Sequence, residues 1–473
     1  MDRMTAGVLW MGGAMVVGAV GLAAVYPWSA PAPDPTPLPE IVEGAVLSVN
    51  PAVVRAIDHE LVHEQLIPDW VRATGGLKAL HWERLQREVA SDPNLSALLD
   101  RMGHLIDQGP AQHLDELEVV VRTWNDVMAS AEVPYRLADE FTARGWFLKA
   151  YRNVLMDASV TVDGGTYGVT VRRRVDEAGP VDAWLGQIHA HQERVVILLD
   201  RVTSFTLDRI WPLLDPVLDT ETDPLASRFA QAVRSEVAAA LPPESVNALV
   251  DTAADRFWLL RATESVHRRA SCGSEYRIVG LPWNGVSTRE QANLRNRAIE
   301  TGENPCPDVT EQEALVFAVR SMHVRQIPGV RDALEQLVAF VATAVVTHEA
   351  RHAADFAQRA QGTPLVCRGC PEELPALGVW EGSAYLSTFA VPDFASIALF
   401  QACAIDPVRQ PDRAAAVRFL AEELVDGGCR RPPPSDLAHR AQTLEAILFD
   451  RAGSVSLEAF PKGLPVSSTY GSR

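Results

Sequence analysis

Features that mark several common classes of function are missing from this 473-residue chain. Lysine occurs only as Lys78, Lys149 and Lys462, and no run of basic residues is longer than Arg172–Arg174. The formal net charge is -18, so the chain lacks the clustered positive surface that phosphate groups require, and the sequence predicts no nucleic-acid partner. A glycine-rich phosphate loop, a Gly-x-Ser-x-Gly elbow and an internal repeat of fixed period are also absent.

Charged residues are missing from the stretch between Thr5 and Tyr26. About 20 apolar residues can cross a bilayer as a helix, and Arg3 in front of this stretch favours a cytoplasmic N-terminus. The sequence therefore predicts a transmembrane anchor over residues 1–26 and a single-pass protein of the cell membrane. The bulk of the chain would then be extracytoplasmic, either periplasmic or extracellular. A cleaved signal peptide is the alternative, because Gly21–Ala23 offers small residues at a suitable spacing for cleavage.

Cysteine is absent from the first half of the chain, and all six cysteines follow residue 271. An even number of cysteines in an exported protein indicates disulfides. Cys367 and Cys370 could form a small disulfide, a redox pair or half of a zinc knuckle, but a second pair at comparable spacing is missing, which favours the disulfide. Local spacing predicts three bridges: Cys272 with Cys306, Cys367 with Cys370, and Cys403 with Cys429.

The remaining pattern predicts a mainly helical α+β protein with a small antiparallel sheet. A β-hairpin is expected near residues 154–175, where β-rich runs flank the turn Asp163-Gly164-Gly165-Thr166. Long helical patterns occupy most of the rest. The expected divisions are a proline-rich linker over 27–45, a mostly helical domain over 46–220, a second domain over 221–453 and a tail over 454–473. The predicted helical patterns cover residues 46–124, 181–218 and 227–269. An irregular region is predicted over residues 272–308.

Within the second domain, the segment Val330–Ala360 reads as one long helix that contains the motif His348-Glu349-Ala350-Arg351-His352. Residues four apart share one face of a helix, so both imidazoles can reach one tetrahedral cation. Glu349 then faces the space beside the ion, where a carboxylate can act as general base. The apolar approach to the motif is typical of a core helix, in which buried histidines need partners.

A catalytic zinc site keeps three protein ligands and one open position, so a third ligand is expected downstream. Glu381 is the best candidate, because it opens a predicted helix over Glu381–Ala390 after an interrupted loop. The small residues Gly382 and Ala384 would permit close approach to the first helix.

At this point the chain resembles the gluzincin metallopeptidases, including the peptidase-MA-like group, over about residues 330–390. The resemblance implies that the second domain, over 221–453, is a zincin-like catalytic and metal-binding domain built on an HExxH helix and a glutamate helix, with Zn²⁺ bound by His348, His352 and Glu381. Glu349 would be the general base. Tyr385 stands where several gluzincins carry a carboxylate, and it could donate a hydrogen bond to the reacting oxygen or simply pack in the core.

Other residues have competing interpretations. Asp355 could accept a hydrogen bond from a ligand imidazole or be a solvated helix charge. His59-Glu60-Leu61-Val62-His63 also matches HExxH, but it lacks the apolar approach and a downstream Glu-Gly-x-Ala partner, and Glu83 is its nearest candidate ligand. No spacing rule connects the remaining histidines of interest to the metal, namely His189, His191, His267 and His439.

These observations predict a membrane-anchored extracytoplasmic zinc metallopeptidase whose substrate is a polypeptide or an amide of the cell envelope. The alternative is a non-catalytic envelope binding protein on a metalloprotease-like scaffold. An intact Glu349 beside two ligand histidines favours catalysis, because a structural site needs no base and is closed by a fourth protein ligand.

Overall fold

The computed structural model describes residues 50–142, 145–176, 185–189, 194–216, 223–252, 329–408, 410–451, 455–457, 460 and 464. All of them belong to one compact unit, Ile41–Arg473. The predicted membrane segment, the proline-rich linker and the irregular region over 272–308 lie outside the described residues. In the part that is described, no helix is both long enough and apolar enough to span a membrane.

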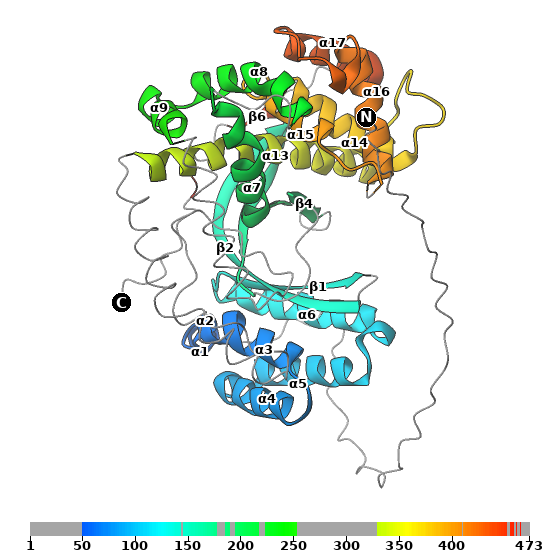
Figure 1. Cartoon of the computed structure of the whole chain (residues 1–473). Helices are drawn as coiled ribbons and strands as arrows, with labels where there is room; N and C mark the ends of the chain where they lie inside the picture. The colour runs from blue at the N-terminus through cyan, green and yellow to red at the C-terminus, as the bar shows by residue number, and fades with distance from the viewer. Residues whose placement is uncertain are drawn as a thin grey trace, which may run out of the picture. The chain divides into compact units, whose positions relative to one another are not determined.

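The chain begins with a group of helices that pack around one hydrophobic core (Figure 1). Trp70 and Trp124 are buried there, together with the apolar faces of the longer helices. The helical pattern predicted over residues 46–124 is thus confirmed in its described part. The helices are α1 (Pro51–Arg55), α2 (His59–Leu61), α3 (Ile67–Arg72), α4 (Gly75–Val89), α5 (Pro93–Gln108) and α6 (Leu114–Ser130), with a π-helical turn over Val62–Leu66.

The described residues form a mixed sheet with the strand order β1-β2-β3-β5-β4, to which the short β6 adds by pairing with β2. Neighbouring strands are antiparallel except β3 and β5, which are parallel. The prediction of an antiparallel sheet was therefore wrong for this one pair. The strands are β1 (Tyr135–Thr142), β2 (Gly145–Val162), β3 (Gly165–Arg174), β4 (Gly186–His189), β5 (Arg194–Leu198) and β6 (Val455–Ser456).

The predicted hairpin is confirmed as β2 and β3. Its turn residues Asp163 and Gly164 both have positive φ, at 49° and 82°, as a two-residue type I′ turn requires. Two register shifts lie between Asn153 and Ala158 in the long strand β2. The first half of β2 packs into the N-terminal core and the second half into the larger core, so the shifts lie where the strand passes from one core to the other.

The helix predicted over residues 181–218 was wrong in its first part. Residues Gly186–His189 and Arg194–Leu198 are strands. Among the described residues of this range, α7 (Leu199–Phe205) and two short helical turns after it are helical. The run Val195–Leu198 is buried on both faces of the sheet, and a fully buried strand has the same continuous apolar pattern as a buried helix. The short β6 likewise lies in the segment predicted as a tail.

The larger core joins the second half of the sheet to the C-terminal helices, and it includes residues on both sides of position 220. The predicted helix over 227–269 is divided at Leu241–Pro243 into two helices, and residues beyond 252 lie outside the described part. The helices of this core are α8 (Pro224–Ala240), α9 (Pro243–Asp251), α13 (Val330–Ala360), α14 (Ala376–Phe389), α15 (Ala395–Cys403), α16 (Pro411–Leu424) and α17 (Leu437–Phe449).

Helix α13 is the longest helix in the described chain, and its 31 residues match the predicted range. It is buried around most of its circumference because it packs on β2, β4 and β5 on one side and on α14 on another. It ends in a Schellman motif, in which Gly362 at φ +87° donates to Arg359 and Thr363 donates to Gln358. The sequence thus fixes both the length and the end of the helix that carries the metal motif.

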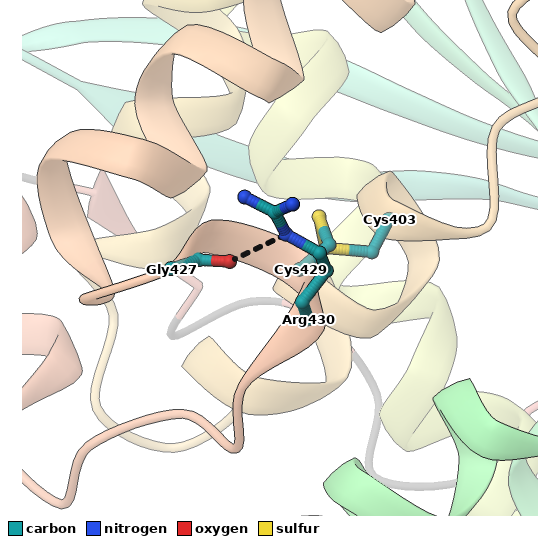
Figure 2. Close-up of a disulfide and its surroundings, with 4 residues drawn as sticks. All are labelled: Cys403, Gly427, Cys429 and Arg430. Atoms are coloured by element: carbon teal, nitrogen blue, oxygen red, sulfur yellow. Dashed lines mark hydrogen bonds between the residues drawn. A yellow bond between two sulfur atoms is a disulfide. The ribbon is translucent and has the colours of Figure 1, made fainter.

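Two of the predicted disulfides are confirmed. Cys367–Cys370 closes the loop between α13 and α14, and the backbone of Arg368 in this loop donates a 2.7 Å hydrogen bond to Leu448. Cys403–Cys429 joins the end of α15 to the turn after α16, where Arg430 Nε donates to the Gly427 carbonyl (Figure 2). The predicted Cys272–Cys306 pair lies outside the described residues.

Glu236 of α8 holds the start of α15, because its carboxylate accepts hydrogen bonds from the backbone N–H groups of Ser396 and Ile397 at 2.6 and 3.0 Å. Burial raises the pKa of Glu236 to about 7, although these hydrogen bonds act in the opposite direction. The folded protein therefore binds this proton more tightly than the unfolded chain does.

We expect Glu236→Gln to remove one component of the pH dependence of stability. For a raised pKa, the stabilising contribution is complete below the ordinary pKa of about 4.5 and is lost as the pH rises towards 7. The free energy of unfolding of the parent should fall relative to that of the variant by on the order of 2 kcal/mol across this range. Urea unfolding at several pH values measures the difference, with exposed Glu423→Gln as control. Identical profiles for the two variants would contradict the raised pKa.

Candidate metal centre

Helix α13 places His348 and His352 on one face, one turn apart. Their rings lie 4.8 Å apart between centroids and nearly perpendicular, at 86°. Both side chains are buried, with 8% and 7% of their surface exposed. Two imidazoles on a buried helix face need polar partners, and these come from the neighbouring helix α14.

Glu381 of α14 brings its Oε2 atom to 3.3 Å from His348 Nε2 and 3.7 Å from His352 Nε2. The three candidate ligand atoms lie within 4.8 Å of one another, and all three residues are buried. Among the described residues, this is the one group of three or more His, Cys, Asp and Glu side chains that could hold a metal ion. The structure therefore brings together the three residues that the sequence predicted as ligands.

The two oxygens of Glu381 have different surroundings. Oε1 accepts hydrogen bonds from Nε and Nη2 of Arg413, both at 2.7 Å. Oε2 is buried and has no hydrogen bond within the described residues, and the same holds for Nδ1 of His348. A buried oxygen that faces two imidazole nitrogens and lacks a donor fits a cation in this position, because an unsatisfied buried acceptor is otherwise costly.

The charges of Glu381 and His348 suit metal binding, whereas His352 must release a proton when an ion binds. Burial alone would raise the pKa of Glu381, but the proximity of His348 and His352 lowers it far below its ordinary value, so the carboxylate is ionised. Burial lowers the pKa of His348. Burial acts in the same direction on His352, but the nearby carboxylates, Glu381 first, outweigh it and raise that pKa. A neutral imidazole and an ionised carboxylate are the forms that bind metals.

Glu349 lies beside the ligand residues on α13 and is 7% exposed. Strand β4 packs directly on it: a Cβ atom added to Gly186 would lie 2.7 Å from Glu349 Cγ and 3.0 Å from Val345 Cγ1. Gly186 is thus required for the approach of β4, which is an edge strand of the described sheet. The sequence around Gly186 gave no signal of this contact, because its segment was interpreted as a helix.

Tyr385 lies one turn after Glu381, and its ring centroid is 4.4 Å from that of His348. Its other ring neighbour is Phe389, at 5.9 Å. Burial and the charge of Glu381 raise the pKa of the Tyr385 hydroxyl, which therefore stays protonated. The ring packs against His348, and the role of the hydroxyl as a donor stays a prediction.

Both interpretations of Asp355 were wrong. Asp355 is neither solvated nor hydrogen-bonded to a histidine within the described structure. It is 1% exposed, accepts a 2.5 Å hydrogen bond from Ser383 of α14, and pairs with Arg351 and Arg451 at 2.9 and 3.1 Å. Arg351, which stands between the two ligand histidines in sequence, also pairs with Asp163 in the hairpin turn. These contacts connect α13 to α14, to the hairpin turn and to Arg451.

In the second HExxH motif, both ring nitrogens of His63 are satisfied by protein groups. His63 uses both ring nitrogens: Trp124 Nε1 donates to Nε2 at 3.2 Å, so Nδ1 carries the proton and donates to the His59 carbonyl at 3.1 Å. Burial lowers the pKa of His63 to about 3. His59 donates through Nε2 to the Val54 carbonyl at 2.7 Å. Glu83, its suggested ligand, is exposed on α4. His63 thus has no lone pair to offer a metal.

Two of the four other histidines of interest lie in the described part of the chain, His189 and His439. His439 is exposed at the start of α17, and His189 lies on β4 instead of the predicted helix. His191 and His267 are outside the described residues. Gly382 also differs from expectation, because a Cβ at this position would contact Ala416 of α16 at 3.9 Å. Gly382 therefore faces α16, and a Cβ would make only an ordinary van der Waals contact there.

No protein-family model matches this chain. Neither a curated protein nor a solved structure matches it. The interpretation of the centre therefore depends on its own geometry and chemistry.

Proposed function

We propose that the protein is a zinc-dependent hydrolase of the metallopeptidase kind, which cleaves an amide bond in a polypeptide or in the cell envelope. The observation that carries this proposal is the buried group of His348, His352 and Glu381, with Glu349 beside it on the same helix. Two imidazoles and one carboxylate are a ligand set of catalytic zinc sites, whereas structural zinc sites are closed by four protein ligands.

The residues around the group have roles that follow from their positions. Zinc bound there would polarise a carbonyl group and lower the pKa of water to about 7. Glu349 would accept a proton from the attacking water and pass it to the leaving nitrogen. Tyr385, held protonated by burial, can donate to the reacting oxygen. Strand β4 is the last strand of the described sheet and lies beside Glu349, so an extended polypeptide bound along it would reach the centre, as in the gluzincins that the motif resembles.

The proposed location is outside the cytoplasm, with residues 1–26 as the membrane anchor. The two disulfides of the described chain support it, because disulfides persist in oxidising compartments and are rare in the cytosol. The zincin-like fold belongs to the same proposal. Its support is the packing of the glutamate helix α14 against α13, and of α13 against the sheet.

Metal analysis tests the centre. We expect the full-length protein to contain about one zinc ion per chain, because one three-ligand group is formed. His348→Ala and His352→Ala should each lose most of this zinc, since two protein ligands hold the ion poorly. His59→Ala is the matched control from the other HExxH motif and should keep the metal. Zinc that depends on His59, or a parent that binds none, would contradict the proposed centre.

A further inference from the structure

The two oxygens of Glu381 differ, because Arg413 binds Oε1 and no described residue donates to Oε2. We propose that Arg413 positions Glu381 as a ligand through one oxygen only and thereby keeps a coordination position open at the metal. This inference rests on the proposed metal centre. It concerns α16, a helix outside the stretch of about residues 330–390 in which the metal motif was found.

The packing of α16 brings Arg413 to Glu381. Arg413 lies in the first turn of α16, which begins at Pro411. Gly378 and Gly382 face this helix from α14, and a Cβ added to Gly378 would lie 3.2 Å from the Asp412 carbonyl. Gly378 therefore allows the backbones of α14 and α16 to approach closely. Gly382, which the sequence predicted to allow contact with α13, faces α16 instead.

Arg413 forms hydrogen bonds to only one of the two oxygens of Glu381. Nε and Nη2 of Arg413 both donate to Oε1 of Glu381 at 2.7 Å, while Oε2 faces the two histidines without a hydrogen bond within the described residues. A carboxylate with two available oxygens can bind a cation through both. With Oε1 held by two charge-assisted hydrogen bonds, Oε2 is the oxygen that is available to the ion.

The ring of His348 is not oriented in the usual way by any described residue. Ligand histidines ordinarily donate their second N–H to a carboxylate or a carbonyl, which fixes the ring. Within the described residues, Nδ1 of His348 has no such partner, and Asp355 is engaged by Ser383 and two arginines. Arg413 instead orients the carboxylate of Glu381 through its two hydrogen bonds to Oε1. It is a positioning residue, since it acts through Glu381.

Cobalt substitution tests the inference through a spectroscopic signal that does not depend on turnover. The full-length parent, Arg413→Met, Arg413→Lys and the exposed control Arg418→Met are stripped and loaded with Co²⁺ alone. We expect Arg413→Met to bind Co²⁺ but to show weaker visible absorption than the parent, because a second Glu381 oxygen raises the coordination number. Arg413→Lys, which keeps a charged donor, should recover part of the parent spectrum. Activity of the zinc form of Arg413→Met should fall about 10- to 100-fold.

The outcomes separate this inference from the proposed function. A parent that binds neither zinc nor cobalt would remove the metal centre and the inference with it. A parent that binds metal, with Arg413→Met equal to it in spectrum and rate, would overturn the role of Arg413 alone. Loss of metal from Arg413→Met to the extent seen for Glu381→Ala would also overturn it, because Arg413 would then be needed for binding and not for the mode of coordination. Circular dichroism of each variant confirms that the comparison is between folded proteins.

Discussion

Glu349→Gln should remove turnover and keep the metal. Glu349 is buried beside His348 and His352 but is not a member of the ligand group, so its amide can occupy the same space without disturbing the ion. The amide cannot accept a proton from water, and general acid–base catalysis typically contributes about 10²- to 10⁴-fold to a rate. We expect kcat/KM to fall by at least this factor on any peptide that the parent cleaves, with zinc content and unfolding midpoint close to those of the parent.

Two variants provide the contrast for this experiment. Asp332→Asn changes an exposed carboxylate near the start of the same helix and should leave activity at the parent level. Glu381→Gln removes the charge of a ligand, so its zinc content and activity should fall together. A Glu349→Gln protein that still cleaves the parent's substrates would remove the proposed mechanism. A parent that binds zinc but cleaves nothing in a broad peptide library would favour the binding-protein alternative.

The metal group could be predicted because its chemistry is local in sequence. His348 and His352 are one helical turn apart, and the apolar residues before them indicate a buried helix, so their shared direction follows from helix geometry alone. Glu381 was found because it follows the loop after this helix and because a third ligand was required. The structure extends its helix five residues earlier, to Ala376, but leaves Glu381 facing the histidines.

The contacts that complete the centre depend on distant segments, and no local sequence pattern indicated them. Arg413 reaches Glu381 from 32 residues away, and Gly186 approaches Glu349 from a strand that was interpreted as a helix. The second HExxH motif shows that a local pattern can also suggest a metal site where distant residues already satisfy the histidine. Its spacing equals that of the metal motif, and only the donation from Trp124, 61 residues away, shows that His63 is already satisfied.

The buried ion pairs behind the metal centre also join distant segments. Arg451, just after α17, donates to Asp355 of α13 at 3.1 Å, to Ser383 Oγ of α14 at 2.6 Å and to Glu445 at 2.9 Å. The side chains of Asp355 and Glu445 are fully buried, and that of Arg451 is 13% exposed. Burial raises the pKa of Glu445 against the effect of Arg451, as expected for a carboxylate that depends on its partner to remain charged.

Arg451→Met should therefore be strongly destabilising, because it leaves two buried carboxylates with fewer partners. Removal of one member of a buried ion pair costs about 3–5 kcal/mol. The matched control is Arg440→Met on α17, whose pair with Asp436 is exposed and should contribute less than about 1 kcal/mol. Urea unfolding at pH 7 with constant excess zinc measures both. Adding Asp355→Asn and Glu445→Gln to Arg451→Met should recover part of the loss, since neutral amides remove the uncompensated charges. Equal effects of Arg451→Met and Arg440→Met would show that the buried network does not hold α13, α14 and the end of α17 together.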